Sequence, residues 1–147
     1  MSSPNRLIQL VVFRLQTHEF ALPVGDVAEV LRMVAITSVP EAPAWMPGVI
    51  NLRGRVIPVV DLRLRLGLSA QAPGLDTPIL VIRVDQMLFG GIADAMVEVL
   101  TLPGEAVEAI ASADSAPHAA AAFARAGDRL IVVLDVHQLQ VGIPVIE

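Results

Sequence analysis

The pattern of apolar and polar positions predicts short β-strands joined by tight turns. Apolar, β-branched residues run from position 7 to 15, four polar residues follow, and a second apolar stretch covers 20–23, which predicts a β-hairpin. Three further hairpins are predicted around short polar turns, at 49–52 with 56–60, 79–84 with 87–92, and 119–124 with 130–134. The chain is therefore expected to be mainly β, with a few short helices.

Other local patterns predict the segments between these strands. Val24, Val27, Val30 and Leu31 recur at intervals of three and four, which predicts a short amphipathic helical turn. The loops are predicted from their Pro, Gly and Ser content at 40–48, 67–78 and 111–118.

Two strand assignments carry alternatives. Pro58 lacks an amide donor, so its strand is expected at a sheet edge or with a bulge. The alanines at 119–122 are also compatible with a helix, because alanine is the strongest helix former.

Two halves of the chain share one pattern. Residues 10–33 match 79–102 at an offset of 69, and residues 55–62 match 129–136 at an offset of 74. The matches include polar residues in order, an Arg, a Glu, an Arg and an Asp. We therefore expect one domain over 1–147 with an internal repeat at about 7–68 and 77–142. It would form two five-stranded barrels side by side, with a groove between them and with strands that could cross between the halves.

Composition excludes several classes of protein. The 147 residues include ten basic residues, all arginine, and fifteen acidic ones, and the arginines are not clustered as nucleic-acid binding would require. The absence of cysteine excludes disulfides and thiolate chemistry. The longest charge-free runs, 42–52 and 136–146, are shorter than the roughly 18–20 residues that span a bilayer. Because the N-terminus also lacks an apolar signal core, we expect a cytoplasmic protein without membrane insertion.

Candidate catalytic groups are sparse. His18, His118 and His137 show no metal-ligand spacing, and no serine or threonine is placed beside a base. Asp61 and Asp135 each end a strand before a helix-like segment, where an N-cap belongs. The sequence therefore predicts no enzyme, no metal and no cofactor.

Three side chains are candidates for partner binding. Arg53 and Arg55 flank Gly54 at a predicted hairpin tip, where guanidinium groups are either solvated or able to reach carboxylates of a partner. Trp45, in the proline-rich loop, either caps the core or anchors an interface.

The segment 45–63, WMPGVINLRGRVIPVVDLR, resembles the CheW family, the adaptors of bacterial chemosensory arrays. The resemblance continues through 20–32, 77–100 and 127–139. It implies two five-stranded SH3-like barrels without catalytic activity. It also implies two partners, the cytoplasmic hairpin tip of chemoreceptors and the regulatory domain of the histidine kinase CheA, with location at membrane receptor arrays through protein contacts.

The resemblance further implies a set of receptor- or array-binding residues, namely Val27, Glu29, Gly48, Arg53 and Thr77. A receptor tip is a helical hairpin, which suits the groove between two barrels, with Arg53 as a polar clamp. The alanines at 119–122 replace a stretch that often contains glycine in the family, so kinase binding is less strongly implied than receptor binding. A barrel module for a small ligand or oligosaccharide is the alternative, and an enzyme is the least favoured hypothesis.

Overall fold

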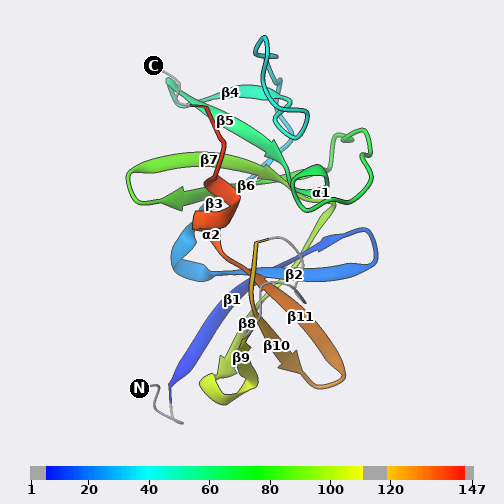
Figure 1. The fold of residues 1–147 in the computed structure, drawn as a ribbon, viewed down its shortest axis with the longest axis vertical. Coiled ribbons are helices and arrows are strands. Elements are labelled where there is room, and N and C mark those ends of the chain that lie inside the picture. Colours follow the sequence, from blue (N-terminus) through cyan, green and yellow to red (C-terminus); the bar gives the residue numbers. More distant parts are fainter. Residues whose placement is uncertain (1–5, 111–118, 145–147) are drawn as a thin grey trace.

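Two β-sheets, one above the other in Figure 1, make up the protein in a computed structural model that describes residues 6–110 and 119–144. The first half of the chain contributes β1 (Leu7–Leu15), β2 (His18–Pro23), the 3-10 turn η1 (Val24–Asp26), β3 (Val27–Arg32), β4 (Gly48–Leu52), β5 (Arg55–Asp61) and α1 (Leu62–Arg65). The second half contributes β6 (Pro78–Val84), β7 (Met87–Ile92), β8 (Ala95–Pro103), η2 (Gly104–Ala106), β9 (Val107–Ala109), β10 (Ala120–Ala126), β11 (Arg129–Leu134) and α2 (Val136–Gln140). The predicted mainly β class is confirmed.

Each sheet is built from both halves of the chain. The strand order is β8-β1-β2-β11-β10-β9 in one sheet and β3-β6-β7-β5-β4 in the other. The first hairpin, β1 with β2, therefore lies among strands of the second half, and the hairpin β6 with β7 lies among strands of the first half (Figure 1). Strands thus cross between the two halves of the chain. We call the two units the six-stranded and the five-stranded barrel.

Segments that match at the two offsets occupy corresponding places. The β5–β7 pair is parallel, with Val59 beside Gly90, and the corresponding β11–β2 pair is parallel, with Val133 beside Ala21. The outer strands β3 and β8 also share an irregularity, because the register of each slips by one residue, at Ala28 and at Val97. One backbone plan therefore serves both barrels.

The apolar core has three parts. One cluster fills the five-stranded barrel and one fills the six-stranded barrel. The third and largest lies between them and takes side chains from both sheets, including Phe13, Phe20 and Leu22 from one and Leu80, Ile82 and Phe89 from the other. The rings of Phe13 and Phe20 stack with centroids 6.3 Å apart. Because each buried aromatic or aliphatic side chain contributes about 1.5–3 kcal/mol, this shared core joins the barrels into one folding unit.

The two helices begin as predicted. The Asp61 carboxylate accepts hydrogen bonds from the amides of Arg63 and Leu64 at 3.0 and 3.3 Å, and the Asp135 carboxylate accepts one from the His137 amide at 2.9 Å. Both aspartates are N-caps, which hold amide groups that a helix start leaves without partners.

The helical turn predicted across 24–31 is wrong. Only Val24–Asp26 forms a 3-10 turn, and Val27–Arg32 is strand β3, paired with β6. The bulge at Ala28 adds one residue to the strand, so its apolar positions recur at three instead of two. The sequence pattern was therefore that of an interrupted strand.

The edge or bulge predicted from Pro58 is also wrong. Strand β5 lies between β4 and β7, inside the sheet. Its pairing with β7 begins only at Val59, so the missing donor of Pro58 interrupts no ladder on that side. Residues 120–126 form a strand and not a helix, whereas the loop predicted at 111–118, with His118, lies outside the described residues.

A candidate partner-binding site on the five-stranded barrel

Arg53 and Glu29 form an ion pair at one end of the five-stranded barrel. Glu29 lies on β3 and Arg53 in the turn after β4, and these are the two outer strands of the sheet. Their contact, together with a backbone bridge between Thr37 and Val49, joins the two edges. The Arg53 side chain is 70% exposed and that of Glu29 is 31% exposed, so the arginine is available to a partner.

The local sequence fixes the direction of Arg53. Arg53 and Gly54 both have positive φ, 50° and 85°, as the two central residues of a type I′ hairpin turn require. The Asn51 side chain accepts a hydrogen bond from the Gly54 amide at 2.8 Å. This bond stabilises a left-handed conformation that is uncommon for arginine.

Val27 lies on the same strand as Glu29 but has a different role. The bulge at Ala28 separates them, so Val27 is half-buried against the shared core whereas Glu29 reaches Arg53. Met96 and Glu98 repeat this arrangement on β8, with Met96 against the shared core and Glu98 paired with Arg129.

Gly48 is buried where two backbones approach closely. A Cβ atom at this position would lie 2.0 Å from the Thr37 carbonyl oxygen, so no larger residue fits without a shift of the backbone. Gly48 therefore allows the bridge between Thr37 and Val49 that supports the β4–β5 hairpin.

Thr77 lies apart from the Arg53 site. Its hydroxyl accepts a hydrogen bond from the Gly74 amide at 2.8 Å and so closes a turn. Thr77 also lines a pocket of about 360 Å³ together with Arg63 and Asp94. Of the five residues that the family resemblance implied, only Glu29 and Arg53 contact each other through polar side-chain groups.

A polar link between the two barrels was not anticipated from the sequence. Asp94, in the connection from β7 to β8, accepts hydrogen bonds from the Gln16 amide at 2.6 Å and from Arg63 Nε at 2.7 Å. Burial raises the pKa of Asp94, but the bonds from Arg63 and Gln16 outweigh it and lower the pKa below its usual value. The carboxylate therefore stays charged and ties the β1–β2 turn to α1.

Burial has the opposite net effect on the cap of α1. The pKa of Asp61 is raised because desolvation outweighs its hydrogen bonds from the Leu64 and Arg63 amides.

Trp45 caps the core, which is one of the two roles considered for it. The ring packs against the shared core and against Gly142, and the Arg65 guanidinium lies 4.6 Å from the ring centroid. The Trp45 carbonyl accepts a hydrogen bond from the Asp61 amide at 2.8 Å. Trp45 therefore joins the proline-rich loop to both helix regions.

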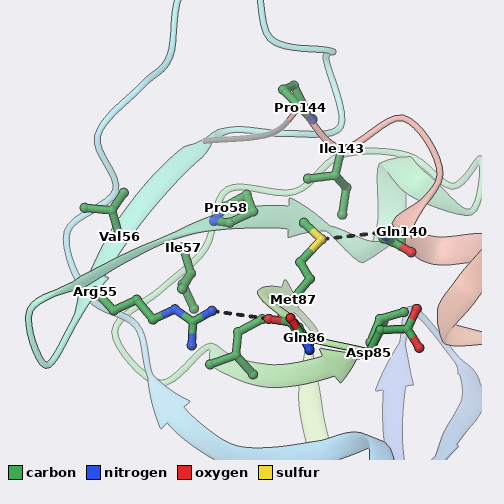
Figure 2. A pocket seen from close by; sticks show the side chains of 12 residues that line it. Arg55, Val56, Ile57, Pro58, Asp85, Gln86, Met87, Gln140, Ile143 and Pro144 are labelled. Carbon is green, nitrogen blue, oxygen red and sulfur yellow. Dashed lines mark hydrogen bonds between the residues drawn. The ribbon is translucent and has the colours of Figure 1, made fainter. Parts of the chain in front are cut away.

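Arg55 leaves the hairpin toward a different neighbour. Its guanidinium donates to the Gln86 carbonyl at 3.4 Å, a long hydrogen bond, and it lines a pocket of about 470 Å³ (Figure 2). Met87 and Ile143 lie in the same pocket, and the Gln140 side chain donates to the Met87 sulfur at 3.5 Å.

The described residues show no group of three or more His, Asp or Glu side chains suited to a metal ion. His137 lies 3.5 Å from Asp135 and 3.8 Å from Asp85, on an exposed surface. Within the same part of the chain, no helix is long and apolar enough to cross a membrane.

Comparison with known proteins identifies relatives over nearly the whole chain. The family model of the CheW-like domain matches residues 9–141. Chemotaxis protein CheW of Helicobacter pylori is 29% identical over 136 residues, which cover 92% of this chain and 82% of that protein. The probable chemotaxis protein CheW of Rhizobium etli is 36% identical over 100 residues, which cover 68% of this chain and 64% of that protein.

A solved structure agrees with the fold. The scaffolding protein TtCheW of Thermoanaerobacter tengcongensis superposes with a TM-score of 0.85 at 31% identity, over 91% of this chain and 92% of that one. The two barrels with their shared core thus define the fold of a CheW-type scaffold domain. The chain belongs to the family of CheW-like domains.

Proposed function

We propose that this protein is an adaptor that couples the cytoplasmic tips of chemoreceptors to a CheA-type histidine kinase in a chemosensory array. Membership of the CheW-like family supports the adaptor role. The observation that carries the site is the exposed Arg53–Glu29 pair at the end of the five-stranded barrel. The activity is molecular recognition without catalysis or cofactor, and the protein acts in the cytoplasm at receptor arrays through protein contacts.

An exposed ion pair suits this role physically. A pair in water contributes only about 0.2–1 kcal/mol to stability, so Arg53 can exchange Glu29 for a carboxylate of a partner at little cost. Its fork of donors can also bind a second oxygen while Glu29 stays in place. Multiple contacts of modest affinity then suffice in an array, where many are made together.

The test measures binding of the purified receptor tip and of the kinase regulatory domain to immobilised protein. Arg53→Gly is the sharpest variant, because glycine adopts the left-handed turn conformation without strain while the whole side chain with its guanidinium is removed. We expect about tenfold weaker binding of at least one partner, as for a central polar residue of an interface. Arg125→Ala is the matched control, since Arg125 is 74% exposed and lies 4.0 Å from Glu108 on the six-stranded barrel.

Two failures have different meanings. If the unmodified protein binds neither partner, the adaptor function is wrong. If it binds and Arg53→Gly binds equally well, the function stands and the assignment of Arg53 is wrong.

A further inference from the structure

The pocket beside Arg55 has a counterpart on the other barrel. It lies between β5, the β6–β7 turn and the segment after α2 (Figure 2). The second pocket, of about 420 Å³, lies at the corresponding place beside β2, β11 and the segment after α1. At the offsets of the two halves, residues 56, 58, 87, 88 and 140 of the first pocket correspond to residues 130, 132, 18, 19 and 66 of the second.

The two arginines beside these pockets differ in their partners. Arg129, which corresponds to Arg55, binds two carboxylates of its own chain, Glu19 at 2.8 Å and Glu98 at 2.7 Å. These two contacts raise the pKa of Arg129 above its usual value, the bond to Glu19 being the larger cause. Glu19 lies on β2, which neighbours β11, and Glu98 lies on β8, an outer strand of the same sheet.

Neither of the two equivalent positions supplies a carboxylate to Arg55. The position of Glu19 is taken by Leu88, and Glu29, which corresponds to Glu98, is bound by Arg53. Within the described residues Arg55 therefore retains only the long bond to the Gln86 carbonyl. The Arg55 guanidinium, at the position where Arg129 binds two carboxylates, thus faces a pocket to which residues 6–110 and 119–144 bring no carboxylate at that end.

We propose that this pocket, lined by Arg55, Met87 and Ile143, docks a segment of a partner protein that carries an acidic residue next to an apolar one. The carboxylate binds Arg55 as Glu19 binds Arg129, and the apolar side chain enters the space between Met87 and Ile143. A volume of about 470 Å³ lies within the range of about 300–1,000 Å³ that holds small ligands or a few side chains.

The charges also set the direction of the segment. Arg55 and Asp85 lie at opposite ends of the lining, with Gln86 between them (Figure 2). Asp85 repels a second carboxylate, so the acidic residue belongs at the Arg55 end. The inference goes beyond the proposed function, because it holds whether or not Arg53 contacts a receptor.

The test uses the full chain labelled with ¹³C at its five methionine methyl groups, and Met87→Leu assigns the Met87 signal. The probe is the blocked dipeptide acetyl-Glu-Leu-amide, compared with its neutral isostere acetyl-Gln-Leu-amide. We expect a saturable shift of the Met87 methyl signal and about fivefold weaker binding of the glutamine peptide, the size of effect that one charged contact provides. Arg55→Ala should abolish this preference, and Arg55→Glu should prefer acetyl-Lys-Leu-amide.

Arg125→Ala, an exposed arginine away from the pocket, should behave as the unmodified protein. The proposal is overturned if the Met87 signal does not respond, or if the preference for glutamate persists in Arg55→Ala. It is also overturned in favour of a small carboxylate ligand if 4-methylpentanoate shifts Met87 as strongly as the dipeptide. Because Arg55 is exposed, the variants should fold, and the other four methyl signals check this.

Discussion

The two barrels share a backbone plan, but the arginines that pair with their equivalent glutamates, Glu98 and Glu29, differ in position and exposure. In the six-stranded barrel, Arg129 is 36% exposed and binds Glu19 and Glu98. In the five-stranded barrel the equivalent Glu29 binds Arg53, which is 70% exposed and lies at the hairpin tip. The pair on the six-stranded barrel suits a structural role, whereas the pair on the five-stranded barrel suits recognition. The same strand arrangement can therefore hold an arginine in ion pairs within the six-stranded barrel and expose an arginine to a partner on the five-stranded barrel.

The hairpin turns show how this difference arises. The six-stranded barrel has Gly127, with φ 62°, where the five-stranded barrel has Arg53, with φ 50°. Glycine adopts this conformation without steric cost, whereas arginine does not. A charged residue in that position presents its side chain at the tip, and the Asn51 hydrogen bond to Gly54 compensates for part of the cost.

The largest expected change in stability comes from substituting Gly48, the buried residue that begins β4. Gly48→Ala should destabilise the protein by about 3 kcal/mol, because the new methyl group collides with the Thr37 carbonyl. The corresponding residue in the six-stranded barrel is Ala122, where Ala122→Gly should cost only about 0.5–1 kcal/mol. Urea unfolding of both variants measures the difference, and equal losses would contradict the special role of Gly48.

The link between the barrels should contribute the next largest effect. Asp94→Asn removes the charge of the ion-pair partner of Arg63, whose side chain is 12% exposed, and should cost about 2 kcal/mol at neutral pH. The pKa of Asp94 is lowered in the folded protein, so its contribution is complete above the unfolded value of 3.8 and disappears as the pH falls through the folded value. The gap in unfolding free energy between the two proteins should therefore narrow in acid. A gap that stays constant down to the acid transition would contradict this linkage.

The contributions of Arg129 and Arg53 to stability can be compared directly. Arg129→Ala should lower the unfolding free energy by about 1 kcal/mol, since it leaves two carboxylates unpaired, while Arg53→Ala should cost less than about 0.5 kcal/mol. Both are measured by urea unfolding at two salt concentrations. If Arg53→Ala proved the more destabilising, the structural and recognition roles would have to be exchanged.

The smallest effect is expected at the turn itself. Asn51→Ala should cost about 0.5 kcal/mol, because it removes one exposed hydrogen bond to Gly54. The same variant should weaken partner binding if Arg53 must be held in its left-handed conformation. Asn51→Asp keeps the acceptor and serves as the control. Loss of binding in Asn51→Asp would mean that charge, and not turn geometry, is what the partner detects.

The site was only partly accessible to sequence reasoning. Arg53 and Glu29 were both named from the family resemblance, but their contact could not be foreseen, since it depends on the meeting of the two outer strands. Asp94 was missed because nothing local distinguishes an aspartate at a strand end from a surface residue. Its partners, Gln16 and Arg63, lie 78 and 31 residues away in the chain.

The sequence by itself determined the hairpins, the N-caps at Asp61 and Asp135, and the membership of a two-barrel family, because turns and caps depend on residues within a few positions of each other. Only the tertiary structure decided that each barrel combines strands of both halves and that β3 is a bulged strand. It also decided that Arg55 lacks the carboxylates held by Arg129. These three features depend on how strands far apart in the sequence pair with each other, and that pairing depends on the packing of the shared core.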